Sequence, residues 1–143
     1  MERAEGFYIK GIRFYQKLYQ KGRKRAANVM AFGNRICFMA DIPAALDPGR
    51  GLRLPHFGLG VSIHPAARIG ENCTIYQNVS ICCGEDQKAP EIGDHVLIGS
   101  GAMIAGGVRI GNNCSIGANC IVDCDVPDNA TAVGVPCRII VPK

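Results

Sequence analysis

The chain has 143 residues, of which 48% are hydrophobic and 20% are charged, and its formal net charge is +4. This length fits a single domain, and the composition is typical of soluble globular proteins. No apolar run approaches the roughly 20 residues that a membrane-spanning helix requires. The first six residues carry two acids and lack the apolar core of a signal peptide, so we expect no export signal and a cytoplasmic location.

Residues 1–40 form a basic segment with nine Lys or Arg residues and two Glu residues, a net charge of +7. Apolar and aromatic residues recur there at roughly helical spacing, interrupted at Gly22 and Gly33, which predicts two short helices. Two roles stay open for them. They cover one end of the domain that follows, or residues 10–25, with their basic cluster, contact an anionic partner such as a membrane surface. No base-reading motif accompanies the charge, so we expect no nucleic-acid partner.

From residue 63 to residue 126 an aliphatic residue returns every six positions, with one longer step after Ile81. A period of six fits neither a helix nor a single strand, and it predicts a solenoid whose stacked coils bury two side chains per hexapeptide. The first inward positions are Ile63, Ile69, Ile75, Ile81, Ile92, Ile98, Ile104, Ile110, Ile116 and Val122. The second inward positions are Ala67, Cys73, Val79, Val96, Ala102, Val108, Cys114, Cys120 and Val126. Ile42, Pro48 and Leu54 extend the pattern towards the N-terminus.

Three of the eight cysteines occupy inward positions, where cysteine serves as a small apolar residue. The other cysteines lack the paired spacing of a zinc site, and the three histidines are well separated, so we expect no metal. A reducing compartment fits this cysteine usage.

The six-residue count fails at two places, around residues 55–60 and across residues 82–90. Loops that interrupt a rigid repeat often carry the function of a solenoid. The first interruption contains His56, and the second contains Lys88 and Ala89. We therefore look for the site at these two loops.

Four stretches resemble the hexapeptide-repeat acyltransferases, and among them the serine acetyltransferases in particular: ADIPAA (40–45), GLRLPH (51–56), IGENCTIYQNV (69–79) and AVGVPCRII (132–140). The resemblance implies a left-handed parallel β-helix over residues 41–143, preceded by the helical segment 1–40. It also implies that Asp41 and His56, fifteen residues apart, match the catalytic pair of these enzymes, and that acetyl-CoA is the donor.

The chemistry explains why such enzymes need this pair. An alcohol attacks a thioester poorly unless a base removes its proton, and histidine is suited to that task near neutral pH. A carboxylate on the other ring nitrogen fixes the tautomer and stabilises the imidazolium. We therefore expect His56 to act as the base and Asp41 to orient it.

The family resemblance places the donor more loosely. It implies that Ser100, Gly101 and Ala102 contact the thioester arm of CoA, with a backbone N–H near Gly101 as an oxyanion donor, and that Arg138 or Lys143 meets a phosphate. A second explanation for the glycine, that it turns a corner of the coil, stays open.

The acceptor is left undecided. The serine enzymes carry an aspartate before the catalytic histidine and an Arg-His pair in the long loop, where this chain has Pro55 and Lys88-Ala89. The resemblance implies a homotrimer with sites between subunits. We therefore expect an acetyl-CoA-dependent O-acetyltransferase acting on serine, with two alternatives: a sugar or polysaccharide intermediate as acceptor, or a non-catalytic trimeric scaffold.

Overall fold

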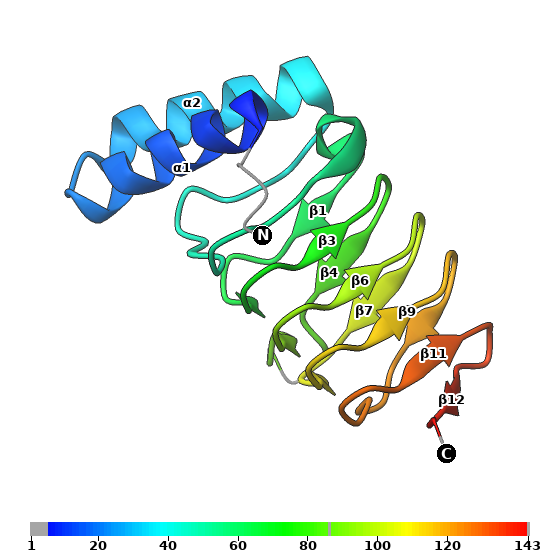
Figure 1. Ribbon diagram of the computed structural model, residues 1–143. Helices are drawn as coiled ribbons and strands as arrows, with labels where there is room; N and C mark the ends of the chain where they lie inside the picture. The colour runs from blue at the N-terminus through cyan, green and yellow to red at the C-terminus, as the bar shows by residue number, and fades with distance from the viewer. Residues whose placement is uncertain (1–5, 86, 143) are drawn as a thin grey trace.

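The computed structural model describes residues 6–85 and 87–142. Two helices lie across one end of a coil of short strands, and the C-terminus lies at the other end of the coil (Figure 1). The helices are α1 (Phe7–Gln20) and α2 (Lys24–Phe38). The coil follows directly, because Asp41 already forms a parallel bridge with Ser62 of the next turn.

The strands stack in three parallel sheets, which form the three faces of the coil. The first face contains β1 (Ser62–Ile63), β4 (Ser80–Cys82), β7 (Met103–Ala105) and β10 (Ile121–Val122). The second face contains β2 (Arg68–Ile69), β5 (Glu91–Ile92) and β8 (Arg109–Ile110). The third face contains β3 (Thr74–Ile75), β6 (Leu97–Ile98), β9 (Ser115–Ile116) and β11 (Thr131–Val133), and it ends with β12 (Arg138–Ile140), which runs antiparallel to β11.

The inward positions predicted from the six-residue repeat are all buried, which confirms the solenoid. Equivalent isoleucines lie directly above one another, as in the register of Ile63, Ile81 and Ile104 on the first face. Each isoleucine therefore covers its neighbours in the adjacent turns, and the core is a continuous column rather than a set of separate clusters. The predicted inward cysteines, Cys73, Cys114 and Cys120, are part of it, and burial raises the pKa of each thiol.

The coil begins before β1, as the positions of Ile42, Pro48 and Leu54 predict. Gly49 donates its N–H to the carbonyl of Ile69, and Arg53 bridges Thr74. These contacts build a first turn under β1, β2 and β3, and the three surplus residues between this turn and the next form the loop that contains His56.

Val126 is buried as predicted, but its predicted position within the repeat is wrong. Val126 bridges Ile110, so it occupies the first inward position on the second face, only four residues after Val122. The carboxylate of Asp125 accepts the N–H of Arg109 at 2.7 Å. This side-chain bond replaces one of the backbone hydrogen bonds that join adjacent turns elsewhere in the coil. The turn of the coil that contains Val122 and Val126 is therefore two residues shorter than the six-residue repeat predicts.

The two predicted helices are confirmed, but one of the two predicted breaks is not. Gly22 lies between the helices with a φ of +81°. Gly33 lies inside α2, which continues through it because one glycine costs a helix only about 1 kcal/mol relative to alanine. None of the helices in the described part of the chain is long and apolar enough to cross a membrane.

Helix α1 covers the first turn of the coil. Ile9, Ile12 and Tyr15 are buried, and the Tyr15 hydroxyl donates to the carbonyl of Ile42 at 3.0 Å. The Arg13 guanidinium donates to the carbonyls of Pro48 and Gly49, at 3.2 and 2.7 Å. Packing on the coil thus explains the buried residues on the inner side of α1. This agrees with the first of the two roles considered from the sequence, that the helices cover one end of the coil.

Candidate active site

One edge of the coil carries three of the predicted site residues, His56, Ser100 and Gly101. It is the edge where each turn passes from the third face to the first face, and we call it the third–first edge. Along it Asn78 donates its N–H to the carbonyl of Leu59, Gly101 donates to Gln77, and Asn119 donates to Ser100, at 2.8, 3.0 and 2.9 Å. Successive turns are about 4.8 Å apart. The His56 loop and the corner at Ser100 therefore lie two turns apart on the same edge.

The loop at the start of this edge is strained. Its short 3-10 turn η1 (Pro55–Gly58) holds His56 at φ +55° and Phe57 at φ +57°. Left-handed backbone is tolerated by histidine but is a genuine outlier for phenylalanine, at a cost of order 1–3 kcal/mol. The Phe57 ring packs on Tyr8 and Phe38, with centroids 5.8 and 5.9 Å away. These contacts hold the loop in a conformation that leaves the His56 side chain exposed.

Asp41 lies beside the same edge but forms no hydrogen bond or ion pair with His56 in this structure. The residue two before it, Met39, accepts the N–H of Gly60 at the end of the His56 loop, at 3.1 Å. The Asp41 carboxylate instead pairs with Arg35 of α2 at 3.5 Å, and the two side chains are 48% and 62% exposed. The fold therefore places the predicted pair at one end of one edge without a hydrogen bond between them.

The predicted CoA residues are divided between two regions. Ser100 and Gly101 form a corner on the third–first edge, and the Gly101 N–H is already bonded to Gln77. The Ala102 side chain is buried in the core, and its carbonyl accepts the N–H of Ser80 at 3.0 Å. Arg138 is exposed on β12, at the far end of the coil from His56, and Lys143 lies outside the described residues.

Gln77 is a candidate that the sequence reading missed. Its side-chain oxygen Oε1 is buried and has no hydrogen-bond partner among the described residues. A buried acceptor without a partner costs about 1–3 kcal/mol, so such an atom needs an explanation. Gln77 lies on the third–first edge, between the turn of His56 and the turn of Ser100. The sequence does contain a signal for Gln77: a large amide side chain stands at a corner where the neighbouring repeats carry small residues.

The second interruption of the repeat lies on a different edge. Residues 83–90 connect β4 on the first face to β5 on the second face. Gly84 donates to the carbonyl of Lys88 at 3.0 Å, and the Lys88 side chain packs over Gly107 of the next turn. Within one chain, His56 and this loop lie at opposite borders of the first face.

The other two histidines have local structural roles. His64 is half-buried and its Nδ1 accepts the N–H of Ala66 at 3.2 Å, while His95 is an exposed corner residue at φ +57°. Over residues 6–85 and 87–142, no group of three or more His, Cys, Asp or Glu side chains is arranged to hold a metal ion.

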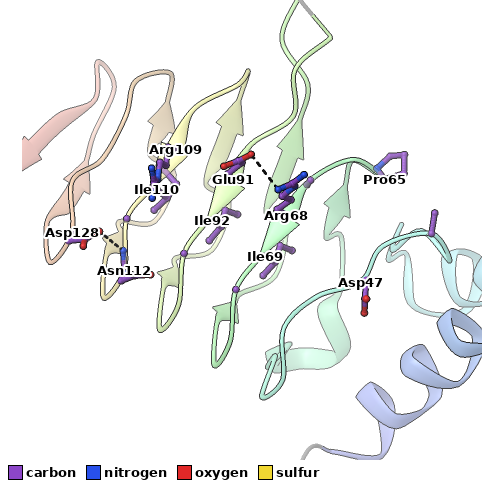
Figure 2. A pocket seen from close by; sticks show the side chains of 15 residues that line it. Asp47, Pro65, Arg68, Ile69, Glu91, Ile92, Arg109, Ile110, Asn112 and Asp128 are labelled. Carbon is purple, nitrogen blue, oxygen red and sulfur yellow. Dashed lines mark hydrogen bonds and ion pairs between the residues drawn. The ribbon is translucent and has the colours of Figure 1, made fainter. Parts of the chain in front are cut away.

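A groove of about 540 Å³ runs over the second face, across β2, β5 and β8 (Figure 2). Charges of both signs line it, including an ion pair between Arg68 and Glu91 at 4.0 Å. Asn112 donates its N–H to the Asp128 carboxylate at 2.8 Å at one end. None of the predicted catalytic or CoA-binding residues lies in this groove.

Comparison with known proteins gives consistent matches. The family model for the bacterial transferase hexapeptide (six repeats) matches residues 89–124. Serine acetyltransferase 5 of Arabidopsis thaliana is 42% identical over 139 residues, which cover 92% of this chain and 43% of that protein. The chain spans about half the length of the curated relatives that it matches.

Solved structures agree with these sequence matches. A serine acetyltransferase of Neisseria gonorrhoeae in complex with serine superposes with a TM-score of 0.84 at 38% identity, over 92% of this chain and 54% of the other. A serine acetyltransferase in complex with CoA superposes with a TM-score of 0.84 at 32% identity, over 93% and 55%. These likenesses also establish the coil as a left-handed parallel β-helix. The chain therefore belongs to the hexapeptide-repeat acyltransferases, and the relatives that it resembles there are serine acetyltransferases.

Proposed function

We propose that this protein transfers the acetyl group of acetyl-CoA to the hydroxyl of serine. The observation that carries the proposal is the strained loop that presents His56 on the third–first edge, two turns from the corner at Ser100. Strained backbone persists where the surrounding structure enforces it, and it concentrates at functional sites. The relatives' complexes with serine and with CoA support this choice of acceptor and donor.

In the proposed reaction His56 takes the proton of the serine hydroxyl as its oxygen attacks the thioester carbonyl. The new bond joins this oxygen to the acetyl carbon, and the carbon–sulfur bond of acetyl-CoA breaks. The CoA sulfur leaves and takes the proton back from the imidazolium, so the products are O-acetylserine and CoA with a free thiol. The exposed His56 side chain is accessible to both substrates.

Asp41 is the proposed orienting residue, and to act it must leave Arg35 and bind the His56 ring instead. An exposed ion pair such as Asp41–Arg35 contributes roughly 0–1 kcal/mol, so breaking it costs little. Replacing Asp41 with Asn removes the charge that stabilises the imidazolium and keeps the side-chain shape. We expect this variant to lose acetyl transfer while it retains the coil.

A homotrimer with sites between subunits is part of the proposal. His56 and the loop of residues 82–90 lie on different edges of the same chain. A substrate bound to a single chain would have to extend across the whole first face to contact both. In a ring of copies, one edge of a chain faces a different edge of its neighbour. We place the enzyme in the cytoplasm, since all eight cysteines are free thiols.

A sugar is the second candidate acceptor. Pro55 precedes His56, and Lys88 and Ala89 occupy the loop positions where the serine enzymes carry polar contacts to their substrate. A pocket without these contacts holds serine less well, because charged partners of a small zwitterion contribute much of its binding.

The test is a free-thiol assay with acetyl-CoA and a panel of serine, other amino acids, sugars and nucleotide sugars. The base is tested with His56→Asn, because asparagine accepts the left-handed backbone at this position. We expect turnover to fall roughly 100- to 10,000-fold. His95→Asn is the matched control, since His95 is also exposed at a positive φ.

Each outcome of this assay is decisive. Near-normal turnover of His56→Asn, with the coil intact by circular dichroism, would rule out the proposed base. Turnover with sugars but not with serine would establish the second acceptor. A wild-type protein that neither binds CoA nor releases its thiol would be a non-catalytic scaffold.

A further inference from the structure

The helix pair α1 and α2 is rich in basic residues and contains no acidic residue of its own. Residues 6–40 contain eight Lys or Arg residues and no Asp or Glu. Two of the eight, Arg13 and Arg35, contact the coil. The other six are exposed: Lys10, Lys17, Lys21, Arg23, Lys24 and Arg25. Covering the end of the coil does not require these charges.

Helix α2 exposes an apolar stripe. Ala27 is its only buried residue, whereas Val29, Phe32 and Ile36 are 71%, 63% and 64% exposed. Spacings of three and four residues place these side chains on one side of the helix, opposite Ala27. Amphipathic surface helices normally turn such a stripe towards the core. Here the stripe stays exposed to solvent, and only Phe32 borders a hollow that α2 shares with Ala44 and Pro65 of the coil.

Helix α1 has a similar outer side. Phe7 and Phe14 are 95% and 56% exposed, and Lys10 and Lys17 are interleaved with them at helical spacing. Between the helices lies an apolar hollow of about 270 Å³, lined by residues such as Ile12, Met30 and Cys37. The helix pair thus combines exposed aromatic rings, exposed cations and an apolar groove. It lies at one end of the coil (Figure 1).

We infer that the helix pair α1–α2 binds the surface of an anionic lipid bilayer. Aromatic and aliphatic side chains insert at the headgroup boundary, while Lys and Arg attract acidic headgroups. A second helix pair is a poorer occupant of this surface, because it brings the same uncompensated positive charge against it. The inference rests on residues 6–40 and does not depend on the proposed acetyl transfer.

Flotation of the whole protein with lipid vesicles tests this inference. We expect the protein to float with vesicles of phosphatidylcholine and phosphatidylglycerol at about 0.1 M salt, and to stay unbound with pure phosphatidylcholine or at about 1 M salt. Replacing Lys21 and Arg25 together with Ala should weaken partitioning roughly thirtyfold, since each basic residue near the surface contributes about fivefold. Free inorganic phosphate, added at the salt-matched ionic strength, should not displace the protein.

A second variant tests the apolar stripe. Phe32→Ser with Ile36→Ser should abolish flotation, and the matched control is Ile140→Ser with Val141→Ser at the other end of the coil, where the side chains are 57% and 59% exposed. Light scattering is measured on the same samples. Flotation lost by the first pair alone, with unchanged mass, supports the inference. Flotation retained by the first pair, or a changed mass that shows the stripe joins copies of the chain, would overturn it.

Discussion

Replacing Gly101 with Ala tests how closely the turns of the coil are stacked at their corners. Gly101 has a φ of +71°, and a Cβ built on it would overlap Oδ1 of Asn119 in the next turn. The same arrangement recurs where Gly60 lies against Asn78. The substitution therefore introduces two separate penalties, a backbone strain and a side-chain overlap.

The size of the effect follows from these two penalties. A residue with a Cβ in the left-handed region costs roughly 1–2 kcal/mol. Moving the Asn119 side chain away from its rotamer adds about 0.5–1.5 kcal/mol. We expect Gly101→Ala to lower the free energy of unfolding by about 1.5–3.5 kcal/mol. The control Gly106→Ala has a similar φ of +84°, and its Cβ would meet only the Cα of Gly84 at 4.0 Å, an ordinary contact, so it should show the backbone strain alone.

Urea unfolding followed by circular dichroism, at one fixed protein concentration, measures these differences. A double-mutant cycle with Asn119→Gly isolates the overlap, because glycine removes the side chain that the new Cβ meets. We expect the double variant to recover about 1 kcal/mol relative to the sum of the single variants. Equal losses for Gly101→Ala and Gly106→Ala, with no recovery in the cycle, would refute the close stacking.

Two further predictions concern buried groups. Tyr15→Phe leaves the carbonyl of Ile42 without its donor and should cost about 1–3 kcal/mol in the same urea assay, whereas Tyr76→Phe, whose hydroxyl makes no hydrogen bond among the described residues, should cost little. Burial raises the pKa of three core thiols, which keeps them protonated near neutral pH, so iodoacetamide should label exposed Cys37 well before them. Peptide mapping by mass spectrometry measures both rates, and equal labelling would contradict the burial of Cys73, Cys114 and Cys120.

The coil was predictable because its repeat leaves little freedom. A fixed step of six assigns each isoleucine to a face, and stacking then determines which residues meet across turns. The shortened step to Val126 escaped prediction for a physical reason. Val126 is apolar and lies four residues after Val122, so it satisfies the second inward position of one hexapeptide and the first position of the next equally well. The bridge of Val126 with Ile110 and the bond from Arg109 to Asp125 distinguish the two alternatives, and both depend on the fold.

The candidate site was predictable as a set of residues but not as a geometry. Sequence spacing places His56 and Ser100 at corners, and the register of the turns then puts both corners on one edge. The left-handed turn of His56 and Phe57 depends on rings from α1 and α2, which no local pattern reveals. The partner of Asp41 likewise comes from α2, a segment whose packing the repeat does not determine.

The contacts of α1 with the first turn also protect one end of the coil. A parallel coil ends in unpaired backbone groups, and a further chain could add there and grow a fibre end to end. Arg13 and Tyr15 occupy the carbonyls of Pro48, Gly49 and Ile42 on that terminal turn, so no incoming strand can use them. Helix α1 therefore hinders the addition of a further strand at this end of the coil.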